Sequence, residues 1–484
     1  MESAQLEWGA DVVADPANAE ASPRHLVAVQ DASLASRLGS AQFRRGYGIK
    51  YAYACGAMYR GVASKELVVA MGRAGLLGFL GAGGMSLERM RADIDFIQRE
   101  LQAHQAYGVN LIANIGDPQS EMHTVQLFLE LGVKTVEASA FMQITPALVL
   151  FRARGLARAS DGSVTSHHRL LAKLSRPEVA RAFMSPAPER MVAKLLQDGA
   201  ITAEQAQLLS VVPMANDICV EADSGGHTDQ GVALVMLSSI QRLRQEMGLD
   251  DKTLCLGLAG GIGTPEAVAA AFMMGADFVV TGSINQCTVE AGTSDAVKDM
   301  LQDIDIQDTT YAPAGDMFEM GAKVQVLKKG VFFPARANRL FILYNQFNSM
   351  DEFPAAVREQ LEDKYFKKSL DAIWQETREF FRSKGQQGEI DKAQTNPKHK
   401  MALVFRWYFG HSMRVAFAGD LNNKVDFQVH TGPALGAFNR WVKGTAWENW
   451  RARHVDQIAE KIMTQAGGLM LSRLRALDVP GTSA

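Results

Sequence analysis

The segment Val220–Gly231 (VEADSGGHTDQG) carries the side chains with the clearest capacity for chemistry in this sequence. Its first residues continue an apolar run that predicts a buried strand. Gly225 and Gly226 then lack side chains, so the backbone can approach a ligand closely and bring His227 over it. An imidazole in that position can give a proton or a hydrogen bond to a developing negative charge. We therefore predict that His227 is catalytic and that the two glycines lie against the ligand.

The same segment allows two other interpretations. Glu221 and Asp223 form a carboxylate pair of the kind that glycosidases use, but both come from one strand end rather than flanking a sugar. Asp223, His227 and Asp229 have side chains that bind metals, yet no second cluster of ligands supports them. We disfavour both interpretations and expect no metal site.

Two further glycine-rich segments, about twenty residues apart, indicate a phosphate site. The first, AGGIGT, contains Gly260 and Gly261, and the second, TGS, contains Gly282 and Ser283. Backbone N–H groups can reach phosphate oxygens only where side chains are absent, and a serine hydroxyl adds a donor. A glycine pair often serves only the turn that contains it. Two such segments after successive predicted strands nevertheless favour a phosphorylated cofactor.

A third segment, CGAMYRG, suits the ring system of the same cofactor. Gly56 and Ala57 are small enough for the backbone to lie against a flat flavin ring, and Met58 can pack on its face. Asn110 and Asn114 stand on one face of another predicted strand and can both donate and accept hydrogen bonds, as a flavin edge or ribityl chain requires. The alternative is that one of these asparagines is only a turn amide. We predict a bound flavin.

The loops that carry these residues need a scaffold. Eight short apolar segments alternate with amphipathic helical patterns, which predicts an α/β fold with a parallel sheet. Glycine-rich loops follow the first, sixth, seventh and eighth segments rather than the first alone, so we favour a (β/α)8 TIM barrel over an open doubly wound sheet. The predicted strands are IKYAYAC (49–55), LLGFLG (76–81), GVNLIAN (108–114), KTVEAS (134–139), HRLLAKLS (168–175), DICVEAD (217–223), TLCLGLAG (253–260) and ADFVVTGS (276–283).

Helix ends are indicated by capping residues. Ser64 is a predicted N-cap, and Thr264 is another, with Pro265 at the first helical position. Apolar residues at helical spacing predict a long helix from Ser86 to about Tyr107.

The chain is predicted to contain four divisions. They are a leader (1–47), the flavin-binding barrel (48–311), a mostly helical accessory domain (312–430) and C-terminal helices that pack on the barrel (431–484). An αα-hairpin at about 186–212 interrupts the barrel, with Thr202 and Gln205 as a capping box.

Aromatic and basic side chains stand out in the accessory division. Core packing is the ordinary role of the aromatic residues. The basic residues can attract an acidic partner or the 2′-phosphate of NADPH, although a solvated face is the ordinary role of each. The residues are Trp374, Phe380, Phe381, Trp407 and Tyr408, and Lys323, Lys328, Lys329, Arg336 and Arg339.

Composition excludes several classes of protein. The 484 residues have a net charge of −3, which disfavours a nucleic-acid binder, and 47% hydrophobic content allows a large core. The four cysteines are far apart, so we expect neither a disulfide framework nor a zinc site, and a reducing cytoplasm as the setting. The N-terminus does not resemble a secretory signal, and no segment has the length of a membrane span.

Four segments together resemble the PfaD-type trans-acting enoyl reductases of polyketide and polyunsaturated fatty acid synthases. They are GAMYRGVASKELVVAMGRAGLLGFLGAGGM, VEADSGGHTD, GLAGGIGTPEAVAAAFMMGADFVVTGSINQ and FEMGAKVQVLKKGVFFPARANRLF, and the resemblance runs from about residue 45 to about residue 465. The wider superfamily, which is similar in the same glycine and histidine motifs, contains nitronate monooxygenases and flavin enoyl-acyl-carrier-protein reductases.

The resemblance implies FMN in the barrel, NADPH as electron donor and an enoyl thioester on an acyl carrier protein as substrate. It also implies that the accessory domain (312–430) receives the substrate or carrier protein, with its aromatic residues as a cover for the acyl chain. It implies that His227 stands at the active site. It assigns Gly260, Gly261, Gly282 and Ser283 to the FMN phosphate and Met58, Asn110 and Asn114 to the ring or ribityl chain. In the wider superfamily Gly-Thr-Arg-Phe often follows the last strand, whereas residues 282–285 here are Gly-Ser-Ile-Asn, so the role of that arginine is unassigned.

Two rival functions remain at this point. One is a nitronate monooxygenase-like flavin oxidase, which would need no surface for a carrier protein. The other is a non-catalytic docking subunit of a megasynthase, against which the glycines at every candidate flavin position argue. Acyl chain length, stereochemistry and the carrier served are not predicted, and a homodimer is left open.

Overall fold

The computed structural model describes residues 34–114 and 116–477, and its largest part is built on a closed barrel of eight parallel strands. The strands follow one another around the barrel in the order β1, β11, β10, β8, β7, β4, β3, β2. Each lies within one of the eight predicted segments, so the TIM barrel is confirmed and the open sheet is excluded. The bounds are β1 Tyr53–Cys55, β2 Leu77–Leu80, β3 Gly108–Ile112, β4 Thr135–Ser139, β7 Arg169–Leu174, β8 Asp217–Glu221, β10 Cys255–Ala259 and β11 Phe278–Thr281.

Helices surround the barrel and begin at the predicted caps. Ser64 accepts a hydrogen bond from the Leu67 N–H at the start of α3, and Thr264 accepts one from the Ala267 N–H at the start of α11. The bounds are α3 Lys65–Arg73, α4 Leu87–Glu100, α5 Pro118–Glu130, α6 Pro146–Arg154, α7 Pro177–Met184, α10 Ala233–Glu246, α11 Pro265–Met273 and α12 Asp295–Leu301.

The predicted long helix after Ser86 ends at Glu100, so its extension to about Tyr107 was wrong. Leu101 is extended, with φ −103° and ψ 145°, and packs from this C-cap position against α3. The Gln105 side chain then accepts the Gln102 N–H at 2.8 Å, a local bond that competes with continued helix.

Two excursions leave the barrel. The predicted αα-hairpin is present as α8 (Glu189–Gln197) and α9 (Ala203–Leu209), and Thr202 and Gln205 form the predicted capping box. A small hairpin of β5 (Leu156–Arg158) and β6 (Val164–Ser166) was not predicted, because its strands are short and largely polar.

The accessory region begins with strands and continues with helices. β12 (Thr309–Pro313) pairs with β13 (Lys323–Leu327), and β13 also pairs with β9 (Gly226–Thr228), which comes from the loop after β8. The helices have their own core, in which Trp374 and Tyr408 are buried. The bounds are α13 Phe333–Gln346, α14 Ala355–Gln360, α15 Leu370–Ser383, α16 Gln387–Thr395 and α17 Pro397–Ala418.

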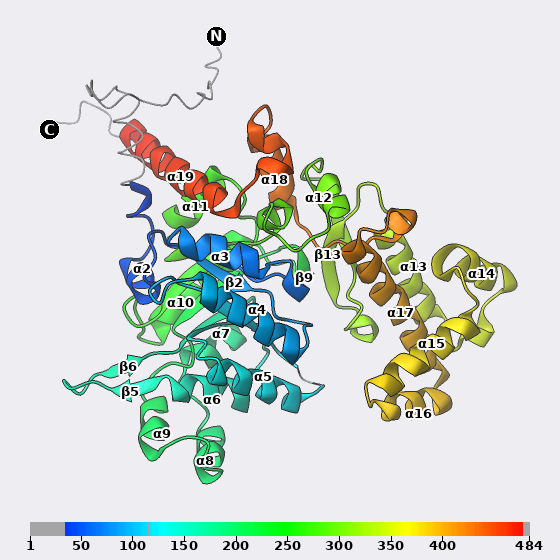
Figure 1. Ribbon diagram of the computed structural model, residues 1–484, viewed down its shortest axis with the longest axis horizontal. Coiled ribbons are helices and arrows are strands. Elements are labelled where there is room, and N and C mark those ends of the chain that lie inside the picture. Colours follow the sequence, from blue (N-terminus) through cyan, green and yellow to red (C-terminus); the bar gives the residue numbers. More distant parts are fainter. Residues whose placement is uncertain (1–33, 115, 478–484) are drawn as a thin grey trace.

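The chain then returns to the barrel. α18 (Pro433–Trp441) and α19 (Val455–Leu477) share the barrel's hydrophobic core, and α19 packs against α11 and α3 (Figure 1). The exact domain boundaries stay predictions. Within the residues described, no helix combines the length and the apolar composition needed to cross a bilayer.

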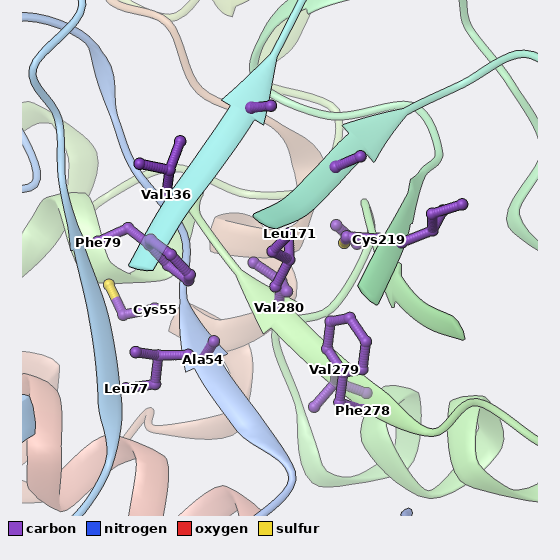
Figure 2. Packing of buried hydrophobic residues seen from close by; sticks show 14 of the residues in the cluster. Ala54, Cys55, Leu77, Phe79, Val136, Leu171, Cys219, Phe278, Val279 and Val280 are labelled. Atoms are coloured by element: carbon purple, nitrogen blue, oxygen red, sulfur yellow. The ribbon is translucent and has the colours of Figure 1, made fainter. Parts of the chain in front are cut away.

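The barrel strands are filled with apolar side chains. Figure 2 shows Phe79, Val136, Leu171 and Val280, contributed by four different strands, packed around one another. All four cysteines are buried as free thiols. This packing makes the strands a rigid support for the loops at their ends.

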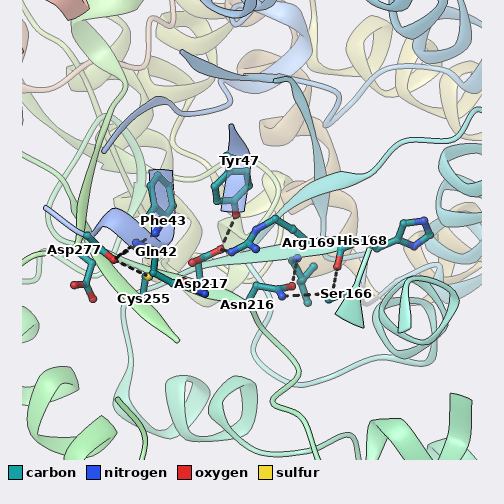
Figure 3. Close-up of polar contacts among 12 residues, drawn as sticks. Gln42, Phe43, Tyr47, Ser166, His168, Arg169, Asn216, Asp217, Cys255 and Asp277 are labelled. Atoms are coloured by element: carbon teal, nitrogen blue, oxygen red, sulfur yellow. Dashed lines mark hydrogen bonds and ion pairs between the residues drawn. The ribbon is translucent and has the colours of Figure 1, made fainter. Parts of the chain in front are cut away.

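The base of the barrel, where the strands begin, is closed by α2 (Ala41–Tyr47). Phe43 stacks on Phe278 with ring centroids 4.0 Å apart. The Tyr47 hydroxyl donates to Asp217 at 2.7 Å, and Arg169 pairs with the same carboxylate oxygen at 2.8 Å (Figure 3). The described end of the predicted leader is therefore a packed part of the barrel, and residues 1–33 lie outside the described residues.

Candidate active site

The four predicted ligand loops meet at one side of the barrel mouth. They follow β8, β10, β11 and β1, which are consecutive strands around the barrel. Because all barrel strands are parallel, the loops after them lie on the same face. Segments far apart in the sequence thus converge as predicted.

The loops after β10 and β11 combine free donors with open space. Gly260 and Gly261 have φ of 87° and 74°, a left-handed conformation that favours glycine. A Cβ at Gly260 would lie 2.6 Å from the Ala222 carbonyl oxygen, whereas Gly261 and Gly282 face open space. No protein acceptor among the described residues takes the N–H of Gly261 or Gly282. These groups fit a phosphate.

Ser283 joins this site to the C-terminal segment. Its Oγ accepts the Gly432 N–H at 3.1 Å, which leaves the serine hydrogen available to a ligand. A Cβ at Gly225 would lie 2.8 Å from Thr431 Cα, so Gly225 is required by protein packing as well. The sequence patterns did not indicate Thr431 and Gly432, because nothing local marks their contact with the mouth.

The loop after β1 is anchored by a buried carboxylate. The Ala57 N–H donates to Glu137 Oε2 at 3.2 Å, and a Cβ at Gly56 would lie 2.8 Å from a Val280 methyl group. Met58 is half-buried, and its carbonyl accepts the Ala63 N–H. Backbone here is therefore held close to the barrel interior without side chains in between, as a flat ligand requires.

The two predicted asparagines have different environments. Asn110 is buried in β3 and donates to Ser139 Oγ at 2.9 Å and to Glu137. Asn114 Oδ1 accepts the Asp117 N–H at 3.1 Å and so shapes the turn before α5. Asn110 lies with the charged groups of the mouth, while the contacts of Asn114 are those of the turn amide that the sequence left as an alternative.

A charge cluster of fully buried Glu137 with half-buried Lys173 and Glu221 completes the inner wall of the mouth. Lys173 Nζ lies 3.2 Å from Glu221 Oε1. Burial and the charge of Glu221 raise the pKa of Glu137, and they outweigh the charge of Lys173 and the hydrogen bonds from Ala57 and Asn110, which lower it. Burial lowers the pKa of Lys173, but the charges of Glu221 and Glu137 outweigh burial, so the pKa of Lys173 is raised. Glu137 Oε1 is buried and has no protein donor, so it fits a ligand that brings an N–H or O–H.

Sequence reasoning missed Glu137 and Lys173. Both interrupt apolar segments that were interpreted only as strands. A charge inside a buried barrel strand is unusual, and that contrast is the signal that was available.

His227 lies on β9 at the outer rim of the mouth, with its side chain 47% exposed. Its Nε2 lies 2.9 Å from Oδ1 of Asp316, which belongs to the turn between β12 and β13. His430, from the segment before α18, presents its ring edge with a centroid separation of 6.4 Å. Three chain segments therefore meet at the candidate catalytic residue.

The carboxylates of the two disfavoured interpretations, the carboxylate pair and the metal site, have separate partners within the protein. Asp223 accepts hydrogen bonds from Thr228, Tyr311 and Gln325. Asp229 pairs instead with Arg176 at 3.0 Å. Neither carboxylate shares a ligand position with His227, and among residues 34–114 and 116–477 no group of three or more metal-binding side chains is assembled.

The basic run does not form one patch. Lys323 is opposite Thr228 in the β13–β9 pair, next to the site. Lys329 binds the Asp303 carbonyl, and Arg336 pairs with buried Asp426. Only Lys323 is thus placed beside His227 by strand pairing.

Two family models match the chain. The nitronate monooxygenase model matches residues 47–327, more than half of the chain, and spans the barrel and β13. The model for the inserted helical domain of acyl-carrier-protein S-malonyltransferase matches residues 347–427.

Relatives match nearly the whole chain. The polyketide biosynthesis protein PksE of Bacillus subtilis is 54% identical over 455 residues, covering 93% of this chain and 59% of PksE. A polyunsaturated fatty acid synthase protein of a Thraustochytrium species is 45% identical over 414 residues, covering 84% of this chain and 28% of that protein. The chain therefore spans less than two thirds of the length of these relatives.

One solved structure is similar to this chain over nearly the whole length of both. The crystal structure of the enoyl reductase domain of MlnA, from the macrolactin biosynthesis cluster of Bacillus amyloliquefaciens, superposes with a TM-score of 0.87. It is 43% identical, and the match covers 91% of this chain and 99% of that domain. The chain belongs to the nitronate monooxygenase-like barrel superfamily and, within it, to the PfaD-type enoyl reductases.

Proposed function

We propose that this chain is an FMN-dependent enoyl reductase that uses NADPH to reduce the α,β-double bond of enoyl thioesters on acyl carrier protein during polyketide or polyunsaturated fatty acid synthesis. The observation that carries the proposal is the convergence of His227 and the four glycine-bearing loops on one side of a barrel mouth. The similarity to the MlnA enoyl reductase domain supports the reaction class.

Each group of residues at the mouth has a role that follows from its position. The N–H groups of Gly261 and Gly282 and the hydroxyl of Ser283 would hold the phosphate of FMN, and the loop after β1 would lie along its ring. When bound, FMN supplies hydride transfer, from NADPH to the β-carbon of the enoyl group. His227 then gives a proton as negative charge develops on the thioester.

The rival functions are less well supported. A nitronate monooxygenase-like oxidase fits the barrel, but not the helical match at residues 347–427, whose namesake acts on acyl carrier protein. A non-catalytic docking subunit does not explain why donors are left free beside open space at Gly261 and Gly282. The carrier-protein partner and the cytoplasmic setting are part of the proposal, and a homodimer stays a prediction.

An anaerobic assay tests the proposal. NADPH should bleach the yellow protein, and addition of a carrier-bound enoyl thioester should restore the colour while its acyl chain gains two hydrogens by mass spectrometry. A colourless protein that cannot be loaded with FMN would support the docking subunit. Oxygen consumption with a nitroalkane anion, without enoyl reduction, would support the oxidase.

A further inference from the structure

The position of His227 is fixed by a region outside the barrel. Val324 of β13 pairs with His227, and Gln325 pairs with Gly226. The turn between β12 and β13 then places Asp316 Oδ1 2.9 Å from His227 Nε2. The strand pairs hold the β12–β13 turn beside β9, so the contact is made by the protein's own segments.

The hydrogen bond to Asp316 assigns the two ring nitrogens of His227. A carboxylate accepts, so Nε2 carries the hydrogen that faces Asp316. Nδ1 has no protein partner in the part of the chain that the structure describes, and is therefore the nitrogen left to face a substrate.

Few charged or titratable groups face His227. They are Asp316 from the β12–β13 turn, Glu221 from the end of β8 and His430 from the C-terminal segment, with Tyr59 of the β1 loop near Asp316. Lys323 of β13 precedes the strand partner of His227, and its ammonium group lies over the Phe341 ring. Burial lowers the pKa of His227, but the hydrogen bond and charge of Asp316, with Glu221, outweigh burial and raise it above the ordinary value.

His430 shows what happens without such a partner. Burial, followed by repulsion from His227, lowers the pKa of His430 to about 4. Its Nε2 contacts the Gln428 amide at 2.8 Å rather than a carboxylate. The pKa values of these two neighbouring imidazoles are therefore shifted in opposite directions, a separation typical of acid–base sites.

We propose that Asp316 is a positioning residue that keeps His227 as an imidazolium with Nδ1–H aimed at the substrate, so that the accessory region completes the active site of the barrel. The proposal rests on the enoyl reductase function proposed above. Hydride forms the new C–H bond at the β-carbon, and the π electrons of the double bond become an enolate. The Nδ1 proton then forms the C–H bond at the α-carbon and leaves a neutral imidazole with Nε2–H on Asp316, which solvent reprotonates.

The substitution Asp316→Asn keeps the size of the side chain and removes its charge. In FMN-loaded protein with isotope-labelled histidine, NMR titration should show the pKa of His227 falling by about one unit, with the His227→Gln spectrum identifying the signal. The rate of flavin reoxidation by enoyl thioester falls as His227 loses its proton, so in Asp316→Asn this fall should begin at a lower pH. At pH values above both pKa values, the variant should be about tenfold slower than the wild type. Reduction by NADPH and FMN content should not change.

Two further variants separate positioning from folding. Asp316→Glu keeps the negative charge and should retain part of the upward shift in the pKa of His227. Glu319→Gln, in the same turn but paired with Arg406 at 3.7 Å, should leave the His227 titration and the pH profile as they are.

The outcomes are distinguishable. An unchanged His227 pKa in Asp316→Asn overturns the inference, and so does a lowered pKa with an unmoved rate profile, because Nδ1 would then not be the donor. If the wild-type protein reduces no enoyl thioester, the proposed function fails, and with it the proton donation to substrate, whatever the titration shows.

Discussion

The two ends of the barrel differ in the backbone around a buried carboxylate. At the base, Asp217 is fully buried, and its Oδ2 receives hydrogen bonds from Tyr47 and Arg169 (Figure 3). At the mouth, Glu137 is also fully buried, and its Oε2 receives hydrogen bonds from Ala57 and Asn110. The second oxygen of each carboxylate has no donor among the described residues, but at the mouth Gly261 also lies beside open space with an N–H that no described residue accepts. The base is closed by the protein's own side chains, whereas the mouth combines free backbone donors with open space.

This difference separates stability from function within one scaffold. A free donor beside open space can be satisfied by a ligand, whereas the hydrogen bonds at the base are made within the protein itself. Substitutions at the base should therefore change unfolding, and substitutions at the mouth should change binding and catalysis.

The largest expected effect is on turnover. His227→Ala should bind FMN normally but reduce enoyl thioesters at least a hundredfold more slowly, because a positioned proton donor contributes about 10²–10⁴-fold. Single-turnover flavin reoxidation measures this loss directly. Turnover equal to that of the wild type would remove His227 from the mechanism.

The next effect is on cofactor content. Gly261→Val should purify without flavin, because it puts a branched side chain at φ 74° into the space proposed for the phosphate. Gly199→Val is the matched control, since Gly199 also has a left-handed φ, of 68°, and open space, but lies between α8 and α9. A fully loaded Gly261→Val protein would contradict the phosphate assignment.

The strands of the barrel were predictable because each is a short, mostly apolar run, and several are bounded by glycines. The candidate cofactor loops were predictable because they follow strands, and the topology brings strand ends together. The segment ADFVVTGS, for example, contains β11 and then Gly282 and Ser283.

Contacts between distant segments were not predictable. β9 has three residues and exists because β13 pairs with it, so a local pattern does not reveal it. The Ser283–Gly432 bond joins residues 149 positions apart. Asp316 belongs to the same class, since nothing near it in the sequence indicates that it faces His227.

A smaller effect is expected at the base, on stability alone. Asp217→Asn should lower the free energy of unfolding by about 3 kcal/mol, because it leaves the Arg169 guanidinium without its charged partner. Urea unfolding measures the change. Asp198→Asn, which breaks the exposed pair with Lys194, should change it by less than about 1 kcal/mol. Flavin content should stay at the wild-type level in both variants.

The smallest expected effect is on how stability at the mouth depends on pH. Because the pKa of Glu137 is raised, first by burial, the fold favours its protonated form. Below the ordinary glutamate pKa of about 4.3, Glu137 is protonated in both the folded and the unfolded chain and costs no stability. As pH rises toward the pKa of Glu137 in the folded protein, the unfolded chain ionises first, and the folded state loses stability. In flavin-free protein, Glu137→Gln should therefore gain stability relative to the wild type as pH increases through that window. The exposed control Glu130→Gln should show no such trend. A loss of stability in Glu137→Gln would mean that the hydrogen bonds from Ala57 and Asn110 to the Glu137 carboxylate outweigh the cost of its burial.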